Sequence, residues 1–335
     1  MSGGRFDGVP VLVTGAQGFV GSWLTERLLA EGARLAVPRR DAKADSRFRA
    51  EGIEEHCDVV DADITDYEAL VRVLHEYRVR AVFHLAGQSV TGVAGRSPYS
   101  TWESNVRGTY TVLEACRAAR EVGETIERIV VSSSILAYAG SEPPWSEDDP
   151  LAATAPYGAS KAAADLLARS YAHSFGLPVA ITRMANVYGG GDLEWTRLIP
   201  DACRAIAGGE RPILRSDGSP VREFLYVEDA VEAYLAVAAS LDDPDARGRA
   251  WNAGGGEPVP VLDVVERLVR VSGRDLTPDV KGDPAERPDR QEVDSTAIRR
   301  ELGWGPAWGL DRGLAATYRW YEAHLEGTAP NPGQD

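Results

Sequence analysis

The 335-residue sequence is poor in the residues that mark secreted, metal-binding or membrane-spanning chains. Its three cysteines, Cys57, Cys116 and Cys203, are odd in number and widely spaced, which fits neither a disulfide framework nor a zinc site. Its five histidines have no metal-ligand spacing. The N-terminal segment MSGGRFDGVP is unlike a signal peptide, and no apolar run reaches the roughly 18 residues that cross a bilayer. We therefore expect a soluble, cytoplasmic protein with no metal and no membrane partner.

Positive charge is also scarce. The 36 lysines and arginines stand against 51 aspartates and glutamates, for a net charge of −15. Such a chain repels nucleic acid, which we exclude as a general partner, and an anionic ligand needs a local basic site. Apolar residues make up 44% of the chain, enough to bury a substantial core.

Short apolar runs alternate with longer amphipathic stretches through the first half of the chain. Strands are predicted at 9–14, 34–38, 58–63, 80–86, 127–133 and 177–183, with helices between most of them. This alternation predicts an α/β fold, a doubly wound parallel sheet of the Rossmann type.

The regular alternation of predicted strands and helices ends after about Asn186. Between 187 and 325 Gly-rich loops are mixed with predicted helices at 194–208, 228–240 and about 310–325 and a strand at 221–227. We predict a dinucleotide-binding domain over 1–186 that also carries the catalytic residues. A smaller mixed α/β lobe over 187–325 is predicted to bind the substrate, and 326–335 to be a mobile tail.

Three glycines at intervals of three occupy the segment VLVTGAQGFVGSWL (11–24), where the first predicted strand meets the first helix. Gly15 allows the tight turn, Gly18 lets the backbone approach a pyrophosphate, and Gly21 lets the helix pack closely on the sheet. The spacing alone is a weak signal. Its position at the start of a βαβ series predicts a dinucleotide site rather than glycines used only for packing.

The end of the second strand bears on which dinucleotide binds. An NAD-binding chain usually has an acidic residue there, whereas this chain has Pro38 followed by Arg39 and Arg40. Two guanidinium groups suit the 2′-phosphate of NADP, so the sequence favours NADP over NAD. The alternative is a solvated basic loop. Asp63 is a candidate for binding the adenine amino group, or else belongs to a helix N-terminal turn.

The segment YGASK places Tyr157 and Lys161 at positions i and i+4, on one face of a helix. A neighbouring cation lowers the pKa of a phenol from about 10 toward the working range, so the pair can act as a general base or acid. The spacing is common by chance. Together with the glycine-rich turn and the serine-rich segment VVSSSILAY (130–138), it indicates an active site.

With these motifs the sequence resembles the extended short-chain dehydrogenase/reductase superfamily, in its nucleotide-sugar epimerase/dehydratase branch. The resemblance covers about residues 8–322. The matching segments, in the family's order, are TGAQGFVG (14–21), DADITD (61–66), HLAGQ (84–88), SNVRGT (104–109), SSS (132–134), PYGASK (156–161), RMANVYGGGD (183–192), VREFLYVEDA (221–230) and LGW (302–304).

The resemblance implies roles for individual residues. Tyr157 is the expected catalytic acid/base, Lys161 the residue that binds the nicotinamide ribose, and Ser134 the hydroxyl that bonds the reacting sugar oxygen. The other implied cofactor-binding residues are Gly15, Gln17, Gly18, Phe19, Val20, Gly21, Arg39, Arg40, Asp63, Ile64, Leu85, Ala86, Gly87 and Asn105. The implied residues for a nucleotide-diphosphate sugar are Gln88, Ser134, Asn186, Arg197, Leu198, Arg222 and Arg287.

Family chemistry begins with oxidation of a sugar carbon, in which hydride moves to the nicotinamide while the tyrosine takes the hydroxyl proton. Dehydratases and decarboxylases of the branch have ionisable residues directly after the catalytic Ser or Thr, where this chain has Ile135 and Leu136. Other segments look closest to CDP-glucose and GDP-mannose 4,6-dehydratase-like proteins. The sequence therefore favours an epimerase. The alternatives are a 4,6-dehydratase, an NADPH-dependent 4-keto-sugar reductase and, more remotely, a non-catalytic NADP-sensing protein.

The predicted helices around 100–119 and 157–174 carry apolar, alanine-rich faces. The named positions are Val112, Ala115, Ala119, Ala164, Leu167, Ala168 and Tyr171. These faces either belong to the core or form the four-helix interface that two chains of the family share, and we expect a homodimer.

Overall fold

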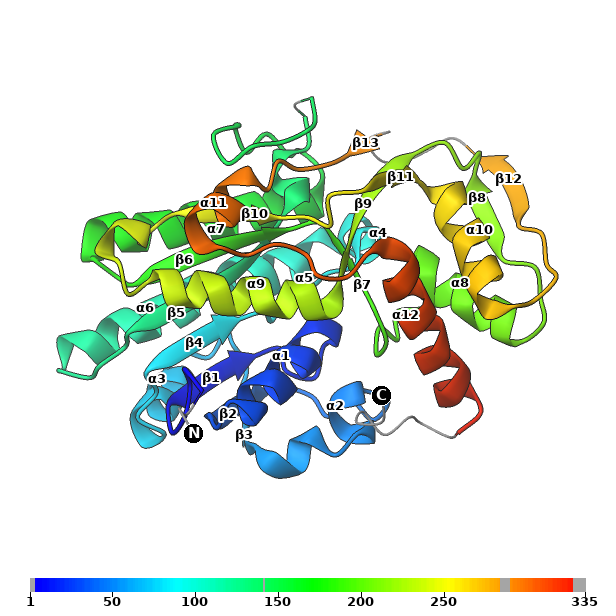
Figure 1. Cartoon of the computed structure of the whole chain (residues 1–335). Helices are drawn as coiled ribbons and strands as arrows, with labels where there is room; N and C mark the ends of the chain where they lie inside the picture. Colours follow the sequence, from blue (N-terminus) through cyan, green and yellow to red (C-terminus); the bar gives the residue numbers. More distant parts are fainter. Residues whose placement is uncertain (1–3, 141, 284–289, 328–335) are drawn as a thin grey trace.

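The computed structural model describes residues 4–140, 142–283 and 290–327. Its central sheet has seven parallel strands in the order β10-β6-β5-β4-β1-β2-β3 (Figure 1). The strands are β1 (Pro10–Thr14), β2 (Arg34–Arg39), β3 (Asp58–Asp61), β4 (Ala81–His84), β5 (Arg128–Ser134), β6 (Val179–Met184) and β10 (Ala250–Ala253). The order of the first six strands is that of a doubly wound sheet, which confirms the predicted Rossmann fold.

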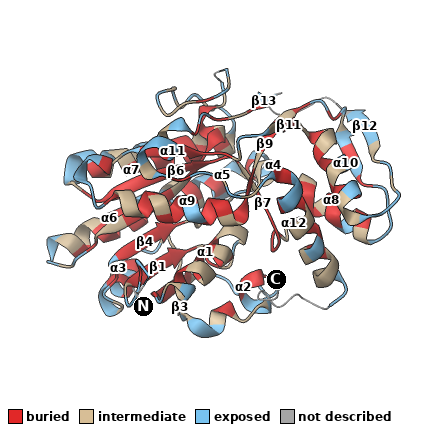
Figure 2. Ribbon diagram, viewed as in Figure 1, coloured by how far each residue is buried: buried red, intermediate tan, exposed pale blue. Residues whose placement is uncertain are grey.

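Successive residues of these strands face two separate cores, one on each side of the sheet. Val11 and Val13 of β1 join one buried cluster, while Leu12 between them joins the other. The first cluster is covered by α1 (Phe19–Ala30) and α9 (Val227–Ser240), and the second by α3 (Tyr67–Glu76), α6 (Gly108–Glu121) and α7 (Pro156–Phe175). Figure 2 shows the strands as the most continuously buried part of the molecule, as expected of a parallel sheet with helices on both faces.

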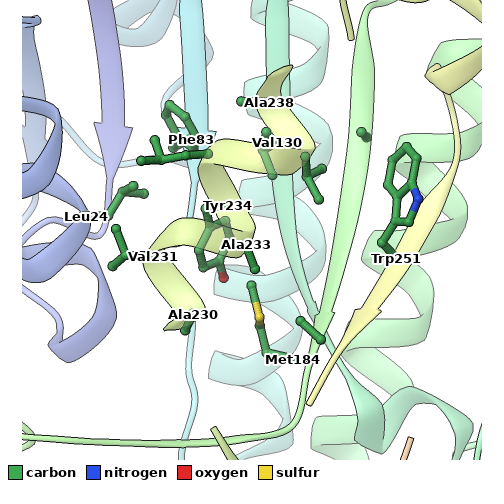
Figure 3. Packing of buried hydrophobic residues seen from close by; sticks show 14 of the residues in the cluster. Leu24, Phe83, Val130, Met184, Ala230, Val231, Ala233, Tyr234, Ala238 and Trp251 are labelled. Carbon is green, nitrogen blue, oxygen red and sulfur yellow. The ribbon is translucent and has the colours of Figure 1, made fainter. Parts of the chain in front are cut away.

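Helix α9 and strand β10 belong to this central sheet although both follow residue 186. Figure 3 shows Val231 and Tyr234 of α9 close to Phe83 and Val130 of the sheet. Strand β10 pairs with β6 and is the seventh strand. This arrangement differs from the prediction of a separate lobe over all of 187–325. The segment AWNA that forms β10 is too short for its period to identify it as a strand.

The remaining part of the chain forms a second lobe with its own core. Strand β9 (Val221–Tyr226) pairs with β7 (Asn186–Tyr188), β11 (Pro258–Pro260) and β13 (Arg290–Gln291), and β8 (Ile213–Ser216) pairs with β12 (Asp279–Asp283). Helices α8 (Leu198–Ala207), α10 (Val261–Ser272) and α12 (Leu310–Leu325) surround a buried cluster that includes Ile199, Val264 and Leu314.

The described residues also form the short helices α2 (Arg47–Ala50), α4 (Thr91–Arg96), α5 (Pro98–Trp102) and α11 (Thr296–Leu302). Within the described ranges no helix is long and apolar enough to cross a membrane. The predicted tail at 326–335 lies almost wholly outside the described residues.

Aromatic side chains join the second lobe to helices α1 and α2. The indole N–H of Trp23 donates to the carbonyl oxygen of Gly190 at 2.8 Å, and that of Trp320 donates to Glu51 at 3.0 Å. The Arg47 guanidinium lies 4.0 Å from the centre of the Trp23 ring. A Cβ on Gly190 would lie 2.3 Å from Cγ of Trp320, so α12 can pack here only against a residue without a side chain.

We expect Gly190→Ala to lower the free energy of unfolding by about 1–3 kcal/mol, because the Trp320 ring must move to admit a methyl group. Gly305→Ala is the matched control, since a Cβ on Gly305 meets no described atom within 4 Å, and its effect should stay within about 0.5 kcal/mol. Urea unfolding followed by tryptophan fluorescence measures both. Equal losses in the two variants would contradict this account of the contact between the lobes.

Candidate active site

The turn between β1 and α1 leaves bare backbone at the carboxyl edge of the sheet. Gly15 has a φ of +79°, and a Cβ there would lie 2.7 Å from the nitrogen of Ala86 and 3.0 Å from the carbonyl carbon of Leu85. A Cβ on Gly21 would lie 2.1 Å from the carbonyl oxygen of Gly15. Among the described residues, no side chain caps α1 at Gly18, and its first turn holds no acidic residue. The positive end of α1 therefore fits the pyrophosphate of a dinucleotide.

Three further predicted cofactor residues lie around this turn. Phe19 and Val20 are the first residues of α1. The side-chain amide of Gln17 donates to the carbonyl oxygen of Asp41 and accepts from the backbone N–H of Lys43, both at 3.0 Å. Gln17 thus fixes the loop that follows β2 against the glycine turn.

The two arginines after β2 already have carboxylate partners. Arg39 contacts Glu54 at 2.7 Å and Asp61 at 3.0 Å. Arg40 is more exposed and contacts Asp41 at 2.5 Å, and this hydrogen bond raises the pKa of its guanidinium. A phosphate binding to either arginine would have to compete with these carboxylates.

Asp63 and Ile64 lie between β3 and α3. One carboxylate oxygen of Asp63 accepts from both the N–H and the hydroxyl of Thr65 at 2.8 Å, which forms an Asx turn ahead of the helix. The residue that caps α3 is Asp66, whose carboxylate accepts from the N–H of Ala69 at 3.0 Å. Ile64 packs on α6, where a Cβ on Gly108 would lie 2.4 Å from its Cδ1. Contacts of Asp63 and Ile64 with a cofactor stay predictions.

A buried cation lies at the ends of β4 and β5. The Lys161 side chain is 7% exposed and donates from Nζ to the carbonyl oxygen of Ser132 at 2.8 Å, and burial lowers its pKa to about 8. His84 contacts the hydroxyls of Thr14 at 2.8 Å and Thr109 at 3.1 Å. Burial, and then the charge of Lys161, lower the pKa of His84 to about 3. At neutral pH a neutral imidazole therefore lies near a charged amine.

Asn105 holds the loop after β4 against this amine. It lies in the π-helical segment η2 (Glu103–Arg107) between α5 and α6. Its side chain accepts from the N–H of Gln88 at 2.6 Å and donates to the Gln88 carbonyl oxygen at 3.0 Å and the Ser160 hydroxyl at 2.9 Å. A Cβ on Gly87 would lie 2.6 Å from Oδ1 of Asn105 and 3.9 Å from Nζ of Lys161. The predicted residues Gly87, Gln88, Asn105 and Lys161 are thus brought together.

Tyr157 is half-buried in the first turn of α7, and residues of two other elements interact with it. Arg197 of the second lobe and Tyr234 of α9 both interact electrostatically with its phenol. Arg197 donates to Asp192 and to the hydroxyl of Ser89, both at 2.8 Å. It therefore links the second lobe to the loop after β4 at the point where Tyr157 lies.

Ser134 ends β5 and begins a short 3₁₀ turn. Its hydroxyl accepts from the N–H of Leu136 at 3.2 Å, and the residue is 8% exposed. Ile135 is buried in the core cluster and Leu136 is half-buried. Neither of the two side chains that follow Ser134 has a proton to transfer.

The other predicted substrate residues lie on the second lobe. Asn186 donates to the side chain of Gln291 at 3.2 Å, and it lies on β7, which pairs with the strand that carries Arg222. Arg222 is 7% exposed, and Leu198 is the first residue of α8. The binding of a substrate by these residues stays a prediction. Arg287 lies outside the described residues.

Three residues of this site were not predictable from the sequence: Ser89, Asp192 and Tyr234. Asp192 closes the motif segment RMANVYGGGD, and its burial beside Arg197 in this acidic chain is a signal that only the structure supplies. Tyr234 lies in the middle of α9 and is fully buried, so its sequence context is that of an ordinary core tyrosine.

The model of the NAD dependent epimerase/dehydratase family matches residues 11–254. The chain belongs to this family. It is 31% identical to a CDP-glucose 4,6-dehydratase of Salmonella typhimurium, over 96% of this chain and 93% of that protein. It also resembles the solved UDP-glucose 4-epimerase of Thermotoga maritima, with a TM-score of 0.85 and 25% identity over 95% of this chain and 100% of that one. A third match is a dTDP-glucose 4,6-dehydratase of Streptomyces venezuelae, solved with NAD. Its TM-score is 0.82, and it is 30% identical over 95% of this chain and 98% of that one.

These comparisons confirm the family that the sequence motifs indicated, and with it the prediction that the chain is an enzyme. They also bear on the cofactor, because the family is described as NAD dependent. The glycine turn, the buried amine of Lys161 and the loop over Asn105 fit such a dinucleotide. In the described part of the chain no group of histidine, cysteine or acidic residues could hold a metal ion.

We expect Lys161→Met to stabilise the folded chain at neutral pH. Burial lowers the pKa of Lys161 from 10.5 to about 8, so the folded state binds the proton more weakly than the unfolded state does. The buried charge therefore lowers the free energy of unfolding by its full amount below pH 8. This loss shrinks as the pH rises from 8 and disappears above 10.5. The free energy of unfolding at pH 7 should rise by up to about 3 kcal/mol.

The measurement is urea unfolding of both proteins at several values of pH from 7 to above 10. The advantage of Lys161→Met should shrink across that range, whereas the exposed-lysine control Lys43→Met should show no such trend. A difference between Lys161→Met and wild type that does not change with pH would rule out the burial of a charged amine.

Proposed function

We propose that this chain is an NAD-dependent nucleotide-sugar epimerase that works through transient oxidation of one sugar carbon to a ketone. The observation that carries the proposal is the pair Ile135 and Leu136 directly after Ser134. Inverting a carbon by removing and returning a hydride needs one acid/base for one hydroxyl, which Tyr157 supplies. Elimination of water beside the ketone needs a further acid and base, and these two side chains supply neither.

Each residue of the candidate active site has its own role in this proposed reaction. Tyr157 removes the proton from the sugar hydroxyl as the carbon is oxidised and returns it when the carbon is reduced. The buried charge of Lys161 favours the phenolate form of Tyr157 and binds the nicotinamide ribose. Ser134 hydrogen-bonds the reacting sugar oxygen. When bound, NAD supplies the acceptor and donor of the hydride.

NAD rather than NADP is the cofactor that these contacts favour. The sequence favoured NADP because of Arg39 and Arg40, but Arg39 contacts two carboxylates and Arg40 contacts Asp41. A 2′-phosphate would have to displace these partners. An epimerase also regenerates its oxidised cofactor in every cycle, so it does not need a separate supply of NADPH.

The substrate is a nucleotide-diphosphate sugar held between the Rossmann sheet and the second lobe. Arg197 and Arg222 contribute positive charge on the second-lobe side, in a chain whose net charge is −15. Arg197 also interacts with Tyr157, so a diphosphate that binds it lies close to the reacting hydroxyl. This placement supports the prediction that residues after 186 bind the substrate.

The active unit is a homodimer in which α5, α6 and α7 form the contact. Val112, Ala115, Ala119, Ala164 and Ala168 are buried in the core within one chain. The same three helices expose other apolar side chains, namely Tyr99, Trp102, Tyr110, Leu166 and Phe175. These exposed residues offer the apolar area that a second copy would cover. The three cysteines, all within the described residues, are free, which supports a cytoplasmic location.

A 4,6-dehydratase is the second candidate. It is favoured by the identity to the CDP-glucose enzyme and by 34% identity to a dTDP-glucose 4,6-dehydratase of Streptomyces griseus, over 94% of this chain and 94% of that protein. In that case a residue outside the segment after Ser134 must move the second proton.

The test is incubation of the purified chain and NAD with CDP-, GDP-, UDP- and dTDP-hexoses, followed by mass spectrometry and chromatography of the sugars. We expect one of them to give a product of unchanged mass that separates as an epimer. A product lighter by one water would establish the dehydratase instead. Stoichiometric consumption of NADPH with a 4-keto sugar would establish the reductase.

Tyr157→Phe should lower turnover of the accepted substrate by at least about a hundredfold, because it removes the general acid/base. The affinity for NAD should stay within about threefold of wild type, since the phenol is proposed to act on the sugar. Initial rates and calorimetric titration with NAD measure the two effects. Tyr67→Phe, at an exposed tyrosine of α3 outside the proposed dimer contact, is the matched control and should keep full activity. Turnover retained by Tyr157→Phe would remove the basis of the mechanism.

A further inference from the structure

A depression lies at the edge of the central sheet opposite the candidate active site. Its volume is about 560 Å³. It lies at the end of the sheet where the strands begin. Its lining includes Arg80, directly before β4, and Arg128, the first residue of β5. The active-site residues His84 and Ser134 end these same two strands. The depression is thus separated from the candidate active site by the full length of β4 and β5.

The depression is basic although the chain as a whole is strongly acidic. Two carboxylates line it, those of Glu127 and Asp242. Five arginines line it as well: Arg5, Arg80, Arg120, Arg128 and Arg247. Its lining therefore has three more positive than negative charges, in a chain whose net charge is −15. Such a concentration of one sign attracts an anion locally.

Several of these guanidinium groups have donors to spare. Arg80 pairs with Glu127, and Arg128 pairs with Asp242. By contrast, neither Arg5 nor Arg247 forms a salt bridge with any described residue, and both are exposed. The Nε–H of Arg128 is buried without a hydrogen-bond partner among the described residues. The two carboxylates therefore satisfy only part of the charge and only some of the donors.

We propose that this depression binds a diphosphate group, carried by inorganic pyrophosphate or by a nucleotide. The forked guanidinium groups match the paired oxygens of phosphate. A diphosphate balances the excess of three positive charges better than a ligand with a single carboxylate does. The concave shape, walled by the beginnings of neighbouring strands, fits a small ligand rather than a flat macromolecular surface.

The test is calorimetric titration of the full chain, loaded with NAD, with inorganic pyrophosphate and separately with CDP and UDP. Arg5→Ala/Arg247→Ala should weaken pyrophosphate binding at least tenfold. Arg72→Ala/Arg215→Ala removes the same charge from exposed positions outside the depression and should leave the affinity unchanged. The same comparison is made in an Arg222→Ala background, which removes one proposed contact to the substrate's diphosphate. The tenfold loss caused by Arg5→Ala/Arg247→Ala should persist there, so failure of this proposal is distinguishable from failure of the proposed function.

Equal pyrophosphate affinity in wild type and Arg5→Ala/Arg247→Ala would overturn the proposal, as would absence of binding by all three probes at millimolar concentration. The two sources of the diphosphate are distinguished by affinity. The site is assigned to a nucleotide if CDP or UDP binds Arg222→Ala tenfold tighter than pyrophosphate does and if Arg5→Ala/Arg247→Ala weakens that binding. Equal affinities for the three probes assign it to the diphosphate alone.

Discussion

The candidate active site depends on the close approach of two backbone turns at the carboxyl edge of the sheet. The turn after β1 meets the loop after β4, where any side chain on Gly15 would collide with the backbone of Ala86. The loop then passes over Asn105, which hydrogen-bonds Gln88, and a Cβ on Gly87 would lie 3.9 Å from the amine of Lys161. Because no side chain separates these segments, the open end of α1 and the buried amine face the same region. A dinucleotide can therefore extend from one to the other.

A buried positive charge is unfavourable, and the fold tolerates it through its surroundings. Lys161 gives one hydrogen bond to a strand carbonyl, and nearby His84 stays neutral because burial and the amine both oppose its protonation. The sheet that carries these groups is covered by helices on both faces, so apolar burial offsets the cost. We propose that the same charge that lowers stability favours the phenolate of Tyr157, which would be a stability–activity compromise.

Local patterns in the sequence predicted the fold well, and contacts between distant segments were not predictable. The first six strands, the glycine turn and the placement of Tyr157 and Lys161 on one helix follow from short-range periodicity and spacing. Strand β10 was not predicted because its four residues are too few to show a periodic pattern. Arg39 suggested NADP because its partners Glu54 and Asp61 are distant in sequence and become its neighbours only when β3 and the segment before it fold against β2. The link from Arg197 to Ser89 likewise joins residues 108 positions apart.

The central claim is that one hydride leaves a sugar carbon and returns to that carbon within the same active site. The most direct test mixes unlabelled substrate with substrate that carries deuterium at the carbon to be inverted, and analyses the product sugars by mass spectrometry and NMR. The account predicts that deuterium stays at that carbon in the molecules that began with it, and that none enters from heavy water. Loss of the label to solvent, its appearance at another carbon, or its exchange into the unlabelled molecules would contradict the account.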